Sequence, residues 1–178
     1  RHAISQGKSV VVLLPEISTT PQIAGRFRSV FGDDVAVWHS KLSHSSRSWI
    51  WKKICEGDFK IIVGARSAIF TPLKNLGLII VDEEQENAYK QTSSSPKYHA
   101  KEVSLMRGKI NNATVILSSA TPSIESYFNY KTKKFKYLEL PKRYGNAKLP
   151  HVHLVDMVAE NKETGDYNSI FSKLMLEK

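Results

Sequence analysis

An apolar run followed at once by three carboxylates and an amide is the stretch of this sequence best equipped for chemistry. Residues 78–81 are apolar, and Asp82, Glu83, Glu84 and Gln85 come next. The run predicts the end of a buried parallel strand at residues 76–81. Ligands bind at the carboxyl ends of such strands in open α/β sheets. There, one carboxylate can hold Mg²⁺ through water while its neighbour accepts a proton from an attacking water. A strand that ends in a solvated acidic turn has the same pattern, so this interpretation needs support from the rest of the chain.

Four further motifs follow predicted strands in the same way. Apolar runs at residues 10–14, 35–38, 59–63 and 114–117 predict these strands. The motifs that come after them, in chain order, are residues 13–22, 38–40, 64–70 and 119–123. Parallel strands place their carboxyl ends at one edge of a sheet, so we expect all five motifs to meet there. Each motif alone is an ordinary loop, but five together argue against a chance arrangement and favour an NTP-driven motor.

Helical patterns separate the strands. They cover residues 20–32, 43–57, 98–109 and 122–130. Thr20 as N-cap with Pro21 in the first turn begins the first of them, and Ser43 begins the second. In the third, Val103 and Met106 are expected to face the core. Strands that alternate with helices predict an α/β fold: a parallel doubly wound sheet with helices on both faces.

The end of the chain has a different pattern. Residues 135–140 and 152–156 predict two more strands, separated by a connector at 141–150 rich in proline, glycine, asparagine and lysine. Residues 167–178 predict a helix. Lysines concentrate between residues 131 and 148, within a chain of 178 residues that has 26 Lys and Arg against 17 Asp and Glu. The resulting net charge of +9 favours polyanions such as nucleic acid.

Composition excludes several classes of protein. Hydrophobic residues make up 41% of the chain, as in globular proteins, and no apolar run approaches the ~20 residues that span a bilayer. Cys55 is the only cysteine, which excludes an intrachain disulfide and fits a cytosolic setting. No Cys/His spacing suits zinc. Residues 1–4 resemble the end of a helix rather than a secretory signal, so we expect the chain to begin inside a domain.

The triplet Gly7-Lys8-Ser9 resembles part of a phosphate-binding loop but does not meet its requirements. The full motif needs a glycine five positions before Gly7, where this chain has His2. Such a loop also joins a strand to a helix, whereas this triplet leads into a strand. We therefore interpret it as the end of a helix and expect the Walker A loop to be absent from this chain.

In order along the chain, the motifs are similar to those of lobe 1 of superfamily 2 DEAD/DEAH-like helicases, and most of all to the replication restart helicases. The matching strings are LLPEIS and TPQ within residues 13–22, HS and LS within 39–43, GARSA to VDEE within 64–84, and SATPS and ES within 119–126. This resemblance implies a RecA-like P-loop NTPase lobe without its P-loop strand at residues 1–131. A connector and the start of lobe 2 would follow at 132–178. We expect the absent strand to leave a gap in the middle of the sheet, or to allow a neighbouring chain to fill that place.

The resemblance also implies roles in catalysis. Asp82 would hold Mg²⁺ through water, and Glu83 would act as general base for the attacking water. Gln85 stands where the family usually has histidine, and its amide can still donate and accept hydrogen bonds toward the γ-phosphate. Ser119 and Thr121 match the SAT motif, which couples the nucleotide site to DNA movement.

Six further residues are implied in DNA binding: Pro15, Thr20, Arg66, Ser67, Tyr89 and Lys90. The first four match motifs that grip a single-strand backbone, which hydroxyl, guanidinium and main-chain N–H groups can hold without reading bases. Pro15 and Thr20 also suit the start of a helix, and the two roles can coexist. Tyr89 and Lys90 match the start of an aromatic-rich loop that ends at residues 97–99, although residues 92–96 contain no aromatic side chain.

The resemblance further implies ATP and Mg²⁺ as cofactors, and zinc in a domain absent from this chain. The implied partners are forked and single-stranded DNA, single-stranded DNA-binding protein, and primosome or helicase-loading proteins. No membrane partner is implied, and the setting would be the bacterial cytoplasm at the nucleoid. A non-catalytic module that docks on forks or single strands, or another superfamily 2 DNA translocase, are the alternatives. We expect the isolated chain not to hydrolyse ATP, because its phosphate loop and second lobe are absent.

Two pairs of residues carry separate expectations. Trp49 and Trp51 cannot share one face of a helix, so at least one is expected in the core and neither is assigned to DNA. His39 and His99 are expected to be structural residues with satisfied hydrogen bonds rather than metal ligands.

Overall fold

The computed structural model describes residues 1–15, 20–93, 95–142, 145, 150–165, 167 and 169–177, with the side chains of Thr20 and Pro21 excluded. The chain forms two compact units, Arg1–Lys136 and Tyr137–Lys178, and each is described by itself. Among the described residues, no helix has both the length and the apolar character needed to cross a membrane.

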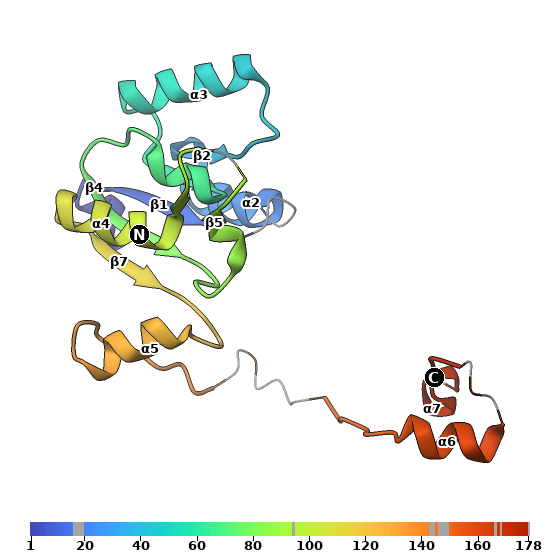
Figure 1. The fold of residues 1–178 in the computed structure, drawn as a ribbon. Coiled ribbons are helices and arrows are strands. Elements are labelled where there is room, and N and C mark those ends of the chain that lie inside the picture. Colours follow the sequence, from blue (N-terminus) through green and yellow to red (C-terminus); the bar gives the residue numbers. More distant parts are fainter. Residues whose placement is uncertain are drawn as a thin grey trace. The chain divides into compact units, whose positions relative to one another are not determined.

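Five parallel strands form the sheet of the first unit (Figure 1). They are β1 (Ser9–Leu13), β2 (Val35–Trp38), β3 (Ile61–Gly64), β4 (Leu76–Val81) and β7 (Thr114–Leu117), in the spatial order β2-β3-β1-β4-β7. The predicted strands and their parallel arrangement are confirmed. The predicted gap is wrong: β1 occupies the middle of the sheet and pairs on both sides, with β3 and with β4.

Helices follow the strands as the sequence predicts. They are α1 (His2–Ser5), α2 (Thr20–Phe31), α3 (His44–Glu56), α4 (Ala100–Asn111) and α5 (Ile124–Lys131). Ser43 caps α3 by accepting a hydrogen bond from the Ser46 N–H, and Gly57 ends it in the left-handed conformation. Short 3₁₀ helices lie at η1 (Gly32–Asp34), η2 (Arg66–Phe70) and η3 (Asn87–Tyr89). A two-stranded hairpin, β5 (Lys90–Gln91) and β6 (Tyr98–His99), leads into α4.

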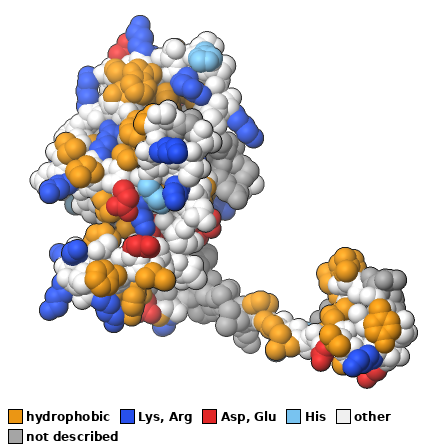
Figure 2. Space-filling view, in the orientation of Figure 1, with side chains coloured by type: hydrophobic (Ala, Val, Ile, Leu, Met, Phe, Trp, Pro, Cys, Tyr) orange, Lys and Arg blue, Asp and Glu red, His pale blue; other side chains and the backbone are white. Residues whose placement is uncertain are grey.

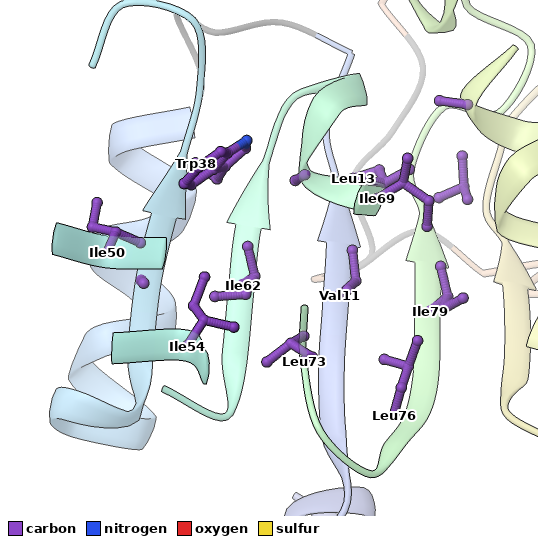
Figure 3. Packing of buried hydrophobic residues seen from close by; sticks show 14 of the residues in the cluster. Val11, Leu13, Trp38, Ile50, Ile54, Ile62, Ile69, Leu73, Leu76 and Ile79 are labelled. Atoms are coloured by element: carbon purple, nitrogen blue, oxygen red, sulfur yellow. The ribbon is translucent and has the colours of Figure 1, made fainter. Parts of the chain in front are cut away.

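Alternate side chains of the strands build two cores, one on each face of the sheet. Val11, Leu13 and Ile62 belong to one core, together with side chains of α3 and η2. Figure 3 shows Ile50 and Ile54 of α3 lying over the strands on this face. On the other face, Val10, Val12 and Ile61 pack against α1 and α2. Helices on both faces confirm the doubly wound architecture and leave the strand ends as the edge where loops can form a site.

Helix α4 presents small and polar residues to the sheet. Ala100, Lys101, Ser104 and Gly108 are buried, whereas 59% of Met106 is exposed, so its predicted inward position is wrong. A side chain at Gly108 would collide with Val115 of β7, its Cβ lying 2.3 Å from the Val115 Cγ2. The close approach of α4 to the sheet therefore depends on small residues, which the apolar periodicity of the sequence does not reveal.

Both tryptophans of α3 are exposed, so the prediction that one lies in the core is wrong. The exposed fractions are 56% for Trp49 and 42% for Trp51. Trp49 contacts Phe59 edge-on, and Trp51 packs at 5.7 Å, centroid to centroid, against the buried Trp38. Ile50 between them fills the core position.

The second unit contains no strand among its described residues, so the predicted strands at 135–140 and 152–156 are wrong. It consists of α6 (Met157–Thr164) and α7 (Lys173–Leu176). Asp156 caps α6 by accepting hydrogen bonds from the N–H groups of Val158 and Ala159, and Gly165 ends it. These cap residues are a sequence signal for a helix that apolar periodicity alone did not show. Of the helix predicted at 167–178, the described residues form only the short helix α7 at Lys173–Leu176.

Candidate functional site

The carboxyl ends of four strands are joined by main-chain hydrogen bonds. The Asp82 N–H donates to the Leu13 carbonyl at 3.0 Å, and the Leu14 N–H donates to the Gly64 carbonyl at 2.9 Å. On the other side, the Glu84 N–H donates to the Ser118 carbonyl at 3.0 Å. The loops that follow β1, β3, β4 and β7 therefore meet at one edge, as the sequence predicts.

A chain of side-chain hydrogen bonds connects the carboxylate motif to the loop after β7. The Gln85 amide donates to the Glu83 carboxylate at 2.9 Å and accepts from the Ser119 hydroxyl at 2.6 Å. The Thr121 N–H in turn donates to the Ser119 hydroxyl oxygen at 2.9 Å. The structure thus brings together Glu83, Gln85, Ser119 and Thr121, with Gln85 between Glu83 and Ser119, and Ser119 between Gln85 and Thr121.

Asp82 and Glu83 are half-buried and have different surroundings. The Ser118 hydroxyl donates to the Asp82 Oδ1 at 3.0 Å, while the Asp82 carbonyl accepts from the Tyr89 hydroxyl at 2.5 Å. Glu83 has a left-handed backbone with φ of 47°, which only a few per cent of residues other than glycine adopt. Such strain persists where the surroundings hold it, and it concentrates at functional sites.

The donor set fits Mg²⁺ rather than zinc. Carboxylate oxygens are the ligands Mg²⁺ prefers, and this ion keeps several waters while using one or two protein carboxylates together with substrate phosphates. In the part of the chain that the structure describes, no three His, Cys, Asp or Glu side chains cluster as a metal site would need. The half-buried Asp82 and Glu83 carboxylates are oxygen donors of the kind that Mg²⁺ uses, and no His or Cys cluster that would suit zinc lies among these described residues.

Glu84 lies beneath this surface, fully buried. Its carboxylate accepts hydrogen bonds from the Ser123 N–H at 2.7 Å, from the Ser126 hydroxyl at 2.9 Å and from the Lys101 ammonium at 3.0 Å. Burial alone would raise the pKa of Glu84, but the hydrogen bonds from Ser123, Lys101 and Ser126 outweigh it and lower that pKa below its ordinary value. Glu84 therefore remains ionised at neutral pH. Sequence analysis did not single out Lys101 or Ser123 as its partners.

Tyr89 has a structural position rather than the exposed one that the DNA-binding assignment requires. It is fully buried, and its hydroxyl lies 3.0 Å from the Leu13 carbonyl as well as 2.5 Å from that of Asp82. Burial raises the pKa of Tyr89, and the negative charges of Asp82, Glu83 and Glu86 raise it further. The ring offers no face to a base, so we withdraw Tyr89 from the set of DNA contacts. Tyr89 belongs instead to the hydrophobic core.

Arg66 connects the loop after β3 to the hairpin. Its guanidinium donates to the Ala88 and Lys90 carbonyls at 3.3 and 3.1 Å. Lys90 is exposed and Ser67 is half-buried in η2. The structure thus brings Arg66, Ser67 and Lys90 into one region beside the strand ends.

The loop after β1 is described only in part. Pro15 is half-buried directly after that strand, and Thr20 is the first residue of α2, although its side chain is not described. Residues 16–19, which include the second half of the LLPEIS motif, lie outside the described residues.

Neither predicted structural histidine is fully satisfied. The Nδ1 atoms of His39 and His99 are buried without a hydrogen-bond partner among the described residues. Burial lowers the pKa of both, and nearby Lys and Arg side chains lower it further, although Glu102 and Glu84 act in the opposite direction on His99. Both are therefore neutral at pH 7. The prediction that their hydrogen bonds are satisfied is wrong, although neither belongs to a metal cluster among these residues.

Helix α5 presents aromatic and basic side chains to solvent. Ile124, Tyr127 and Phe128 are each more than half exposed, and the Lys131 ammonium lies 5.2 Å from the centroid of the Tyr127 ring. Figure 2 shows hydrophobic and basic side chains mixed over this lower part of the first unit, where Figure 1 places α5. The helix is attached to the rest of the unit mainly through its first turn, where Ser123 and Ser126 bind Glu84.

A family model of DEAD/DEAH box helicases matches residues 2–129. These include all five strands of the parallel sheet, the carboxylate motif at residues 82–85 and the loop after β7. The chain belongs to the DEAD/DEAH box helicase family. The fold and the pairing of the carboxylate motif with the loop after β7 agree with this membership. The RecA-like α/β fold that the sequence predicts for a lobe of such a helicase is confirmed.

Among relatives of this helicase chain are two bacterial proteins named Replication restart protein PriA. The one from Chlamydia pneumoniae is 48% identical over 177 residues, covering 99% of this chain and 24% of the relative. The one from Bacillus subtilis is 45% identical over 175 residues, covering 98% of this chain and 21% of the relative. The chain therefore spans about a quarter or less of the length of these relatives, and the resemblance to replication restart helicases is confirmed.

A solved structure has a similar fold. The C-terminal domain of S. cerevisiae Dbp5, bound to Gle1 and IP6, superposes with a TM-score of 0.50 at 14% sequence identity, covering 72% of this chain and 71% of that chain. At this level of identity the similarity concerns the fold alone.

Proposed function

We propose that this chain is the first motor lobe of an ATP-dependent DNA helicase that recognises stalled or repaired replication forks and restarts replication by primosome assembly. The observation that carries the proposal is the hydrogen-bonded chain from Glu83 through Gln85 to Ser119. This chain connects the side chain that would activate water to the loop after the neighbouring strand. Such a connection is what a motor needs if hydrolysis in one place is to move DNA in another.

In this proposal, each residue of the edge has a separate task. Bound Mg²⁺ would neutralise phosphate charge, held through water by Asp82. Glu83 accepts the proton of the attacking water, since its carboxylate is half-buried beside Asp82 and is oriented by the Gln85 amide. Ser119 and Thr121 transmit the state of Gln85 to the loop before α5. ATP would be held by a phosphate loop outside this chain, so we expect the isolated chain not to hydrolyse ATP.

DNA would lie along the region formed by Arg66, Ser67 and Lys90, with Pro15 and Thr20 on the loop after β1. The support is the position of Arg66 and Lys90 beside the strand ends and the net charge of +9. Guanidinium and ammonium groups hold phosphates without reading sequence, as a translocating motor requires.

The proposal includes the organisation and partners of the whole protein. Residues 1–131 would form lobe 1, and residues 132–178 the connector and the start of lobe 2. Forked and single-stranded DNA, single-stranded DNA-binding protein and helicase-loading proteins would be the partners, in the bacterial cytoplasm at the nucleoid. Zinc would be bound in another domain. The similarity to proteins named Replication restart protein PriA over 99% and 98% of the chain supports this choice among helicases.

The test is ATP hydrolysis by the full-length protein with and without forked DNA. We expect strong stimulation by DNA. DNA binding without any turnover would contradict the motor and favour a docking module, and stimulation by double-stranded DNA alone would favour another kind of superfamily 2 translocase.

A second test concerns the proposed DNA region. Arg66→Ala should weaken binding of single-stranded DNA and reduce the slope of log affinity against log salt by about one, since one phosphate contact is lost. Lys52→Ala, on the exposed face of α3, is the matched control and should change neither quantity. An unchanged affinity and salt slope for Arg66→Ala would remove Arg66 from the DNA contacts.

A further inference from the structure

A buried ion pair lies directly behind the proposed general base. Lys101 and Glu84 are 3.0 Å apart, with only 8% and 1% of their side chains exposed. The Lys101 ammonium also donates to the Ser123 hydroxyl at 3.2 Å, and that hydroxyl lies 3.0 Å from the Glu84 carboxylate. Ser126 completes the network on the α5 side. We call these four residues, Glu84, Lys101, Ser123 and Ser126, the buried network.

The buried network joins three elements that are far apart in the sequence. Glu84 follows β4, Lys101 is the second residue of α4, and Ser123 caps α5 by accepting a hydrogen bond from the Ser126 N–H. Helix α4 begins immediately after β6 of the hairpin. Lys101 therefore connects the end of the hairpin to the carboxylate motif, on the opposite side of that motif from Tyr89.

The backbone of Glu83 is held from both sides. On one side, the Asp82 carbonyl accepts from the buried Tyr89 hydroxyl. On the other, the Glu84 side chain is fixed by the buried network, and the Glu84 N–H donates to the Ser118 carbonyl. Between them, Glu83 keeps its left-handed φ of 47°. A strained conformation of this kind persists only where its neighbours determine it.

We propose that Lys101 is a positioning residue that holds Glu83 in its hydrolytic conformation through Glu84 and transmits movement of the hairpin to it. The inference rests on the proposed function, since it concerns the same carboxylate. A buried ion pair is not a strong source of stability, because well-packed apolar residues of the same volume serve as well or better. Its value here lies in geometry: the hydrogen bonds to Glu84 fix the direction in which the adjacent residue leaves the sheet.

The route from the hairpin to Glu83 is short. Lys90, an exposed basic residue of the hairpin, pairs with His99 in the β5–β6 register, and His99 precedes α4 by one residue. A phosphate held at Lys90 would therefore shift the first turn of α4 and with it the Lys101 ammonium. Loss of that ammonium should uncouple DNA binding from hydrolysis without changing the residues that bind ATP.

The experiment uses the full-length protein and three variants. Lys101→Met keeps the length of the side chain but removes its charge, Lys101→Arg keeps the charge, and Lys109→Met changes an exposed lysine of the same helix. ATP turnover is measured against ATP concentration and against single-stranded DNA concentration, and folding is checked by thermal unfolding.

We expect Lys101→Met to lower the DNA-stimulated kcat by about tenfold or more while the KM for ATP stays within about twofold of the wild type. Lys101→Arg should restore kcat to within about threefold, because guanidinium also pairs with carboxylates. Lys109→Met should match the wild type. A Lys101→Met protein with wild-type kcat and wild-type DNA dependence would overturn the inference.

A double variant separates positioning from simple stability. Glu84→Gln together with Lys101→Met removes both buried charges, so it should fold even where Lys101→Met alone does not. If the double variant recovers thermal stability but not DNA-stimulated turnover, the positioning role is supported. If it recovers both, the network is only structural and the inference fails. Absence of turnover in the wild type would instead overturn the proposed function itself, and this inference with it.

Discussion

Glu83 and Glu84 are neighbours in the chain, yet their surroundings are opposite. Glu83 is half-buried, has a strained backbone, and contacts Gln85 at a surface that solvent reaches. Glu84 is fully buried and belongs to a network that ties together three elements. The difference shows how a strand end can combine a carboxylate that is free to do chemistry with one that fixes its direction. An exposed site of this kind needs a rigid layer directly beneath it.

The largest expected effect is a loss of folding stability when the buried network of Glu84, Lys101, Ser123 and Ser126 is disrupted. Lys101→Met in the 178-residue chain should lower the free energy of unfolding by about 3–5 kcal/mol, because it leaves the buried Glu84 carboxylate without its counter-charge. Urea denaturation followed by circular dichroism measures the change. Lys53→Met is the matched control: it removes contacts to Glu56 and Asp58 at the surface, and its unfolding curve should overlay that of the wild type. If Lys101→Met and Lys53→Met lowered the free energy of unfolding equally, the buried ion pair of Lys101 would be no more important than a surface ion pair.

A smaller effect is expected at Tyr89, which supports the other side of Glu83. Tyr89→Phe removes the hydroxyl that lies near the Leu13 and Asp82 carbonyls and should destabilise the chain by about 1–2 kcal/mol. Tyr167→Phe, at an exposed position, is the control. An unchanged free energy of unfolding in Tyr89→Phe would mean that this hydroxyl does not help to hold the turn.

The pH dependence of the free energy of unfolding should show that the buried Glu84 is ionised and paired. The folded pKa of Glu84 is lowered from 4.5, so its ionised form adds stability that is complete above about pH 4.5. That stability is lost as the pH falls from 4.5 through the folded pKa. The stability difference between the wild type and Glu84→Gln should therefore stay constant from pH 7 to about 5 and shrink below it. A difference that grows on acidification would contradict an ionised, paired Glu84.

The central strands of the first unit were predictable from the sequence because both faces of the sheet are buried there, whereas the edge strand β7 is only partly buried, with 45% of Ile116 exposed. Each strand then reads as a continuous apolar run, as in residues 78–81, and β2, β4 and β7 begin and end where the sequence predicts. The sequence was a poorer guide at the end of the chain. The apolar residues at 152–156 predicted a strand, yet Val152 and Leu154 are 80% and 97% exposed and pair with no strand among the described residues. An apolar run predicts a strand only where a sheet is available to receive it.

The site was predictable in its surface layer but not in its support. Because Glu83, Gln85 and Ser119 all follow neighbouring strands of one sheet, their motif spacing predicts that they lie together, as their hydrogen bonds show. Lys101 and Ser123 contact Glu84 across 17 and 39 residues, and no local pattern marks such pairs. Tyr89 shows the reverse: the family resemblance implied a DNA contact, whereas its buried hydroxyl lies within hydrogen-bond distance of two carbonyls at the sheet edge.

The central claim is that Glu83 performs the chemistry and that the groups around it hold it in place. The most direct measurement compares ATP affinity with DNA-stimulated turnover in the full-length protein carrying Glu83→Gln. The substitution removes the proton acceptor but keeps the size of the side chain, so we expect kcat to fall by about a hundredfold or more while ATP affinity stays within about threefold of the wild type. Turnover that persists at the wild-type rate in Glu83→Gln would contradict the account.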